Sequence, residues 1–241
     1  ALGLALLMPE TGFHPAAPEE RNTVARALAA IGQVRGLARR QPRLLTVLGV
    51  GLFFGLYSEG FDRLWNVHLL RDLGVPAIWG LTPVTWMGAI RLIDSLPALI
   101  GTELARRRLR AGGEQRLPAV LLVCAVGIAA GILVFARAGG FWLALAAYWL
   151  VGAFRAASGP LQETWMNAQI DDPQVRATAF SAAGQVDALG QVAAGPAMGA
   201  VGRWASVPAA LTMSALLLTP VAPLLARAMH PRHAEATREE R

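Results

Sequence analysis

Six long apolar stretches limit what this chain can fold into more than any other feature of its sequence. A bilayer core about 30 Å thick needs roughly 20 mostly apolar residues per helix, and a short polar break follows each stretch. A β-barrel would instead show alternating segments of about ten residues. The continuous runs predict an all-α integral membrane protein, a six-transmembrane-helix bundle. The predicted spans are residues 44–70, 80–102, 118–136, 141–168, 177–201 and 206–226.

The composition and the placement of the arginines agree with a membrane protein. Only 16% of the 241 residues are charged, against about 25% in an ordinary soluble domain. The net charge of +6 would also fit a nucleic-acid-binding protein, but the 22 basic residues, all arginine, are distributed unevenly. Sixteen lie in residues 10–43, 103–117, 169–176 and 227–241, and three lie in residues 71–79, 137–140 and 202–205. The positive-inside rule therefore places the C-terminus in the cytoplasm of a multi-pass plasma-membrane protein that needs no nucleic acid.

The flanks of the six-helix domain, which spans residues 44–226, have their own predicted structure. Residues 1–9 are apolar but too short to cross a bilayer, so they are predicted to be the end of a truncated transmembrane helix. Residues 10–43 form a basic cytoplasmic linker with an amphipathic helix from Thr23 to Arg40, suited to a membrane surface. Residues 227–241 form a cytoplasmic tail.

Eight charged residues lie inside the predicted spans, where each costs from about 2.5 to over 10 kcal/mol near the bilayer centre. Helical spacing predicts two local ion pairs, Glu59 with Arg63 and Arg91 with Asp94. If Glu163 lies near the cytoplasmic interface, two acids remain unpaired. The eight residues are Glu59, Asp62, Arg63, Arg91, Asp94, Arg155, Glu163 and Asp187.

The unpaired acids are candidates for proton coupling, because a carboxyl group inside a membrane is either protonated or faces water. Asp62 and Asp187 are the first candidates and Glu59 is the third. Arg155 either pairs with Asp187 or acts in gating or substrate binding, and the sequence leaves both open. The predicted substrate or gating residues are Arg155, Arg91, Asp94, Arg63, Glu163 and Gln191.

Other motifs have simpler interpretations. The chain has no P-loop, no His/Cys metal spacing and no evident nucleophile–base pair, so we expect no enzyme, no cofactor and no metal site. Single residues inside or near the spans have structural interpretations. His68 is predicted to be solvated near the outer interface. Phe53, Phe54 and Phe61 are predicted to face lipid, with an apolar pocket as the alternative. Glycines such as Gly190 predict closely packed helices.

Several segments resemble the C-terminal six-helix half of a major facilitator superfamily (MFS) transporter. MPETGF at 8–13 resembles the end of that family's sixth helix, the basic linker resembles its central loop, and the six spans resemble helices seven to twelve. Gly101, Arg106 and Arg107 resemble its cytoplasmic loop motif, although Ala105 and Arg108 replace the aspartate and the second glycine.

Two further segments are most similar to the drug:proton antiporter branch associated with macrolide and tetracycline efflux. They are SEGFDRLW at 58–65 and PLQETWMNAQIDDPQVRATAFS at 160–181. The resemblance implies alternating access, with the substrate held near the midplane between this half and an N-terminal six-helix half. The expected partners are then the lipid bilayer, protons, a small-molecule substrate and that missing half.

The leading expectation is therefore a secondary active transporter, a proton-coupled antiporter that exports amphiphilic, drug-like compounds. Two alternatives stay open. The charged layer would also suit proton-coupled uptake of a polar nutrient or metabolite. The chain could instead be a noncatalytic membrane assembly module, in which the ion pairs hold a complex together.

Overall fold

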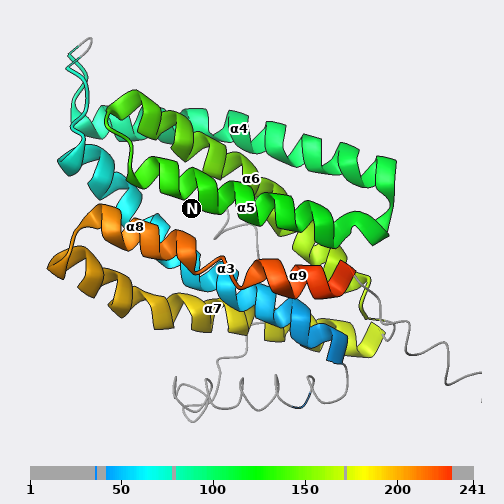
Figure 1. The fold of residues 1–241 in the computed structure, drawn as a ribbon. Helices are drawn as coiled ribbons and strands as arrows, with labels where there is room; N and C mark the ends of the chain where they lie inside the picture. The colour runs from blue at the N-terminus through cyan, green and yellow to red at the C-terminus, as the bar shows by residue number, and fades with distance from the viewer. Residues whose placement is uncertain (1–35, 37–41, 78–79, 171–172, 230–241) are drawn as a thin grey trace, which may run out of the picture.

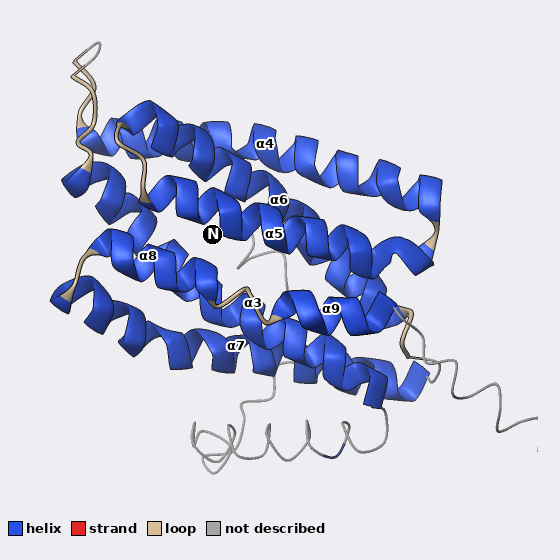
Figure 2. Cartoon of the chain, in the orientation of Figure 1, coloured by secondary structure: helices blue, strands red, loops and turns tan. Residues whose placement is uncertain are grey.

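The computed structural model describes residues 36, 42–77, 80–170 and 173–229, and within these residues the chain is helical without a strand (Figure 2). This confirms the predicted all-α class. The predicted helix end at 1–9, most of the linker at 10–43 and the tail from residue 230 lie outside the described residues. The helices are α3 (Pro42–Val67), α4 (Pro83–Gly112), α5 (Leu117–Ala136), α6 (Phe141–Asn167), α7 (Pro173–Trp204), α8 (Val207–Leu216) and α9 (Val221–Met229), with a π-helical turn η2 (His68–Asp72) and a 3-10 turn η3 (Glu114–Arg116).

Five helical segments of the described chain are long and apolar enough to cross a membrane. They support a membrane-embedded protein, whereas the predicted number of six spans is not confirmed. The helix α7, which contains the predicted span 177–201, is long enough at 32 residues but is not among the five. Its many alanines and glycines and its polar Gln185, Asp187 and Gln191 make it less apolar. The five segments are Leu44–Asp72, Pro83–Arg110, Leu117–Ala136, Phe141–Asn167 and Val207–Met229.

The helix α4 is longer than its apolar stretch predicts. It begins at Pro83, with the hydroxyl of Thr82 accepting a hydrogen bond from the main-chain N–H of Thr85 at 3.3 Å. It then continues ten residues beyond the predicted end at 102, so much of the predicted loop 103–117 is helical. Arginine and leucine favour helix, and the helix ends where Gly113 adopts a positive φ of 68°.

The last predicted span, 206–226, consists of two helices rather than one. The hydroxyl of Ser206 caps α8 by accepting from the N–H of Ala209 at 3.2 Å. Pro220 separates α8 from α9, because its ring has no N–H and clashes with the carbonyl of the residue four positions earlier. The main chain turns here through hydrogen bonds between residues three positions apart instead of four. One example joins the N–H of Thr219 to the carbonyl of Leu216 at 3.0 Å.

The helices pack as a bundle in which α4 and α7 lie at opposite edges (Figure 1). The helix α7 packs along α3, and α4 packs on α6. Between these pairs, α5 contacts α6 as well as α8 and α9. The start of α3, the α4–α5 connection and the end of α9 lie at one end of the bundle (Figure 1). Most of the arginines outside the predicted spans therefore gather at this end of the described chain, which is the arrangement that the charge asymmetry predicts.

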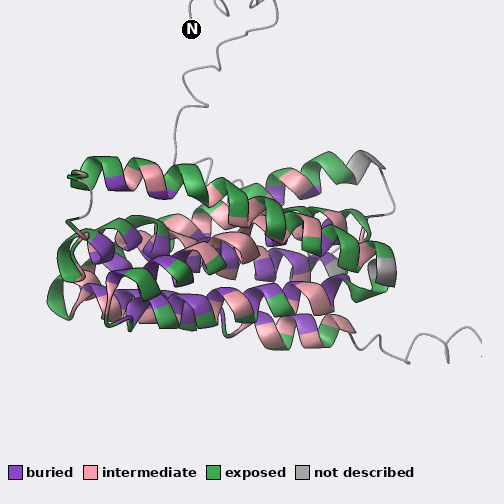
Figure 3. Ribbon diagram, turned by 90° about the horizontal axis from the view of Figure 1, so that it is seen from above, coloured by how far each residue is buried: buried purple, intermediate pink, exposed green. Residues whose placement is uncertain are grey.

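Buried residues concentrate inside the bundle and exposed ones on the outer helices (Figure 3). An aromatic cluster joins α3, α5 and α6, where Phe61 stacks on Tyr148 and also contacts Phe135 edge to face. The helix α4, in contrast, exposes large apolar side chains, with Leu92 77% and Leu99 67% exposed. Such an apolar outer surface suits contact with lipid.

Candidate functional site

An ion pair between two helices lies at the centre of the candidate site. Arg155 of α6 donates two hydrogen bonds to the carboxylate of Asp62 on α3, the Nη2–Oδ2 bond measuring 2.8 Å. The guanidinium also lies 5.8 Å from the ring centroids of Tyr57 and Phe61. Planar, bidentate pairing fixes the geometry of both side chains. Arg155 is therefore held by two turns of α3.

A cavity of about 470 Å³ opens on the α4 side of this pair. We call it the α4-side cavity. Arg91 and Asp94 of α4 face Asp62 and Arg155 across it, so two acids and two arginines line the same space. The Tyr148 hydroxyl donates to Asp94 Oδ2 at 3.3 Å.

The packing around Asp94 leaves part of its carboxylate without a partner. Oδ1 of Asp94 is buried and has no hydrogen-bond partner among the described residues. It lies against Gly152 of α6, where an added Cβ would be 2.8 Å from this oxygen. The absence of a side chain at Gly152 therefore makes room for the carboxylate.

A second cavity, of about 500 Å³, lies on the other side of the pair and is lined by α3, α6 and α7. We call it the α7-side cavity. Asp62 and Arg155 line both cavities, so their ion pair forms the wall between them. The α7-side cavity combines aromatic and thioether surface with two further acids. These residues are Phe54, Tyr57, Met166, Phe180, Glu163 and Asp187.

Asp187 reaches the α7-side cavity from the tight contact between α3 and α7. A Cβ on Gly55 of α3 would collide with the main-chain oxygen of Asp187, and one on Gly190 of α7 would lie 2.6 Å from the oxygen of Leu52. Gln191 donates to the Asp187 carboxylate at 2.9 Å. No arginine forms an ion pair with Asp187 in the described part of the chain.

The two local ion pairs predicted from helical spacing are present. Arg63 Nε contacts Glu59 Oε1 within α3, and neither residue lines either cavity. Arg91 Nη1 lies 3.9 Å from Asp94 Oδ2 on α4, with its guanidinium 4.7 Å from the ring centroid of Trp65.

The prediction that Asp62 is unpaired is wrong, because the structure pairs it with Arg155. Of the two alternatives for Arg155, the ion pair with Asp187 is therefore not formed. Glu163 and Gln191, two predicted substrate or gating residues, do lie on the α7-side cavity.

The three residues of the predicted loop motif lie on α4. Gly101 packs against the main-chain carbonyl of Ala153 on α6. Arg106 and Arg107 both pair with Glu103 one turn earlier, so the motif forms a local charge cluster on a helix.

The structure adds residues that the sequence interpretation missed. Tyr148 could have been found, because Tyr148, Gly152 and Arg155 recur at the spacing of one helix face. Phe54 and Phe61 are buried and line the cavities, so the prediction that they face lipid is wrong for these two. Both cavities also contain charged side chains, so neither is the apolar pocket of the alternative. Phe53 is half-buried and lines neither cavity. His68 is only 2% exposed, which corrects its prediction as a solvated residue.

Comparisons of the chain with protein-family models, with curated proteins and with solved structures found no match. No group of three or more His, Cys, Asp or Glu side chains is placed to hold a metal ion within the described ranges. The site is therefore characterised by its geometry, as a polar interior in a bundle of apolar helices.

Proposed function

We propose that this chain forms part of a secondary active transporter of the MFS type, which exports amphiphilic, drug-like compounds in exchange for protons. The observation that carries the proposal is the pair of cavities separated by Asp62 and Arg155. Charged side chains inside a membrane protein mark substrate or ion pathways, because burying them in lipid is costly. An ion pair between two helices is also a contact that can open when one helix moves.

The lining of the α7-side cavity supports an amphiphilic, cationic substrate. Phe54 and Phe180 offer aromatic surface, and Met166 adapts to irregular apolar shapes. Asp187 and Glu163 supply negative charge to the same space. A cation with an apolar body matches both kinds of group, and aromatic rings attract cations directly.

Asp187 is the coupling acid in this proposal. Of the three acids predicted for proton coupling, Asp62 forms an ion pair with Arg155, and Glu59 forms one with Arg63. Asp187 faces a cavity and pairs with no described arginine, so it is free to exchange a proton. The proposed transporter lies in the plasma membrane with its C-terminus in the cytoplasm, and an N-terminal six-helix half supplies the opposite wall.

A second candidate is proton-coupled uptake of a polar nutrient or metabolite. The α4-side cavity favours it, because two acids and two arginines face this space and would suit a zwitterion better than an apolar drug. Competition and counterflow with zwitterionic and lipophilic solutes would separate the two candidates.

The test is efflux of a lipophilic cationic dye, driven by a proton gradient, from vesicles that carry the full-length transporter. We expect Asp187→Asn to reduce gradient-driven efflux at least tenfold while dye still equilibrates down its own gradient. Glu103→Gln, which neutralises a carboxylate that lines neither cavity, is the matched control and should keep the flux. Full gradient-driven flux in Asp187→Asn would refute the coupling role, and dye efflux no faster than from empty vesicles would refute export.

A further inference from the structure

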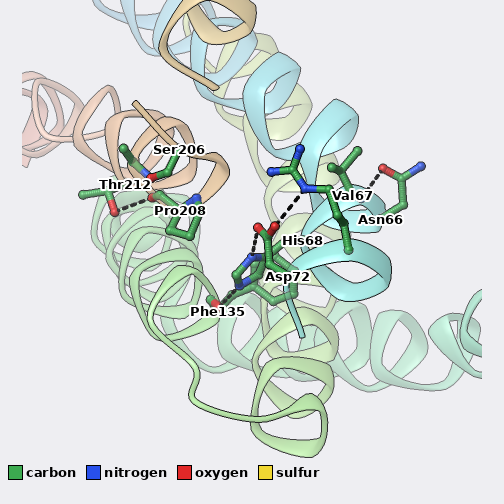
Figure 4. Close-up of polar contacts among 10 residues, drawn as sticks. Asn66, Val67, His68, Asp72, Phe135, Ser206, Pro208 and Thr212 are labelled. Carbon is green, nitrogen blue, oxygen red and sulfur yellow. Dashed lines mark hydrogen bonds and ion pairs between the residues drawn. The ribbon is translucent and has the colours of Figure 1, made fainter. Parts of the chain in front are cut away.

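A buried histidine at the end of α3 lies between two hydrogen-bond acceptors (Figure 4). His68 is the first residue of η2 and lines neither cavity. Its Nδ1 is 3.0 Å from Oδ2 of Asp72, and its Nε2 is 3.1 Å from the main-chain oxygen of Phe135 on α5. The spacing of four residues places His68 and Asp72 on one helix face.

The number of protons on His68 and Asp72 follows from the two atoms that the ring contacts. A main-chain carbonyl cannot donate, so the contact with Phe135 requires a proton on Nε2 of His68. A neutral ring then has no proton on Nδ1. The contact with Asp72 therefore needs either a second ring proton or a protonated carboxyl group. In both cases the two residues together hold one proton more than a neutral histidine beside a carboxylate. Because an imidazole is more basic than a carboxylate, the proposal places this proton on the ring.

We propose that His68 and Asp72 form a proton-binding site that joins the end of α3 to the end of α5. Phe135 is next to the last residue of α5, and the carbonyl end of a helix favours a positive charge. Among the described residues, the other charged group that contacts the pair is Arg71, whose Nε donates to Asp72 Oδ1 at 3.0 Å. From α5, the ring meets the carbonyl and the edge of Phe135, with centroids 5.1 Å apart.

Release of this proton weakens the contact between the two helices. With an ionised Asp72, the single ring proton goes to the carboxylate, and the lone pair of Nε2 then faces the lone pairs of the Phe135 carbonyl. The carbonyl then keeps its bond from the main-chain N–H of Ala138, at 3.3 Å, but loses the bond from His68. This end of the bundle is thus held together more tightly at low pH. The proposal depends on the fold alone and is independent of the transport function.

Nitrogen-15 NMR of the histidine rings in the purified chain, in detergent micelles, tests the site. The chain has four histidines, and the His68 signals are assigned by their loss in His68→Gln. We expect two ring N–H groups protected from solvent exchange at about pH 5.5 and one at about pH 9. One protected N–H group at both pH values would overturn the proposal.

Asp72→Asn is the decisive variant, because it keeps every hydrogen bond without the extra proton. Its amide donates to Nδ1 of a neutral ring, and its oxygen still accepts from Arg71. We expect one ring N–H at every pH in this variant. Between about pH 5.5 and pH 9, the melting temperature of the unmodified chain should fall by on the order of 5 °C more than that of Asp72→Asn.

Arg71→Gln is the matched control, since it changes the other partner of Asp72 and leaves the ring contacts in place. It should keep two protected ring N–H groups at low pH. Equal pH dependence of the melting temperature in the unmodified chain and in Asp72→Asn would also refute the proton-binding site.

Discussion

Arg155 on α6 and Asp62 on α3 are 93 residues apart in the chain, yet they form a two-bond ion pair that is the common wall of two cavities. Their side chains are 29% and 48% exposed, so both remain accessible from the cavities. A substrate or a proton that reaches Asp62 competes directly with Arg155. The pair therefore links the occupancy of the cavities to the contact between α3 and α6.

Reversing the charges of this pair should destabilise the bundle, and reversing both should restore it. Asp62→Arg or Arg155→Asp places like charges together, and we expect each to lower the free energy of unfolding by about 1–3 kcal/mol. The combined swap should recover at least half of the loss. Thermal unfolding in detergent measures the effect, and single variants as stable as the unmodified chain would contradict it.

The matched control is the swap of Glu59 and Arg63 on α3. Arg63 is 71% exposed, and exposed pairs within one helix contribute little. Each single reversal there should cost less than about 1 kcal/mol.

The contact between α3 and α7 should tolerate no added methyl group at Gly55. Gly55→Ala places a Cβ against the main-chain oxygen of Asp187, which cannot move aside as a side chain could. We expect a loss of about 1–3 kcal/mol in the free energy of unfolding, as for other overpacked interiors.

Gly51→Ala, one turn earlier on the same helix, is the control because no atom lies within 4 Å of its added Cβ. It should be neutral or should stabilise the chain by up to about 1 kcal/mol, since alanine favours helix over glycine. Equal melting temperatures for the two variants would show that α3 and α7 do not approach this closely.

The helix α5 should place its two ends on opposite sides of the membrane. In a Cys124→Ser background, which removes the one native cysteine, single cysteines at exposed Gln115 and Gly139 flank this helix. An impermeant maleimide applied to cells should label Gly139→Cys directly and Gln115→Cys only after permeabilisation, because the arginine-rich end faces the cytoplasm. Labelling of both from outside would refute the predicted crossing.

Most of the helices could be predicted from the sequence because apolar length is a local property. The predicted spans 118–136 and 141–168 match α5, Leu117–Ala136, and α6, Phe141–Asn167, to within one residue at each end. The predicted helix bounds are wrong where helix propensity or a proline, and not apolar length, decides where a helix ends. Helix-favouring residues extend α4 to Gly112, and Pro220 divides the last span.

The charges of the candidate site could be predicted only in part. The pairs Glu59–Arg63 and Arg91–Asp94 lie within single helices, so helical spacing identifies them. The partner of Arg155 depends on how α6 rotates against α3, and no spacing rule contains that information. The same holds for His68, whose second acceptor belongs to α5, 67 residues further along the chain.

By itself, then, the sequence determined which residues form apolar helices, which charges lie within them and which of those charges pair along one helix. Each of these depends on neighbours within about two turns. Only the tertiary structure decided that Asp62 and Arg155 meet between two cavities, that Asp187 pairs with no arginine of the described residues, and that His68 lies between Asp72 and Phe135. These contacts arise where side chains of different helices fill a shared interior, so they depend on the packing of the whole bundle.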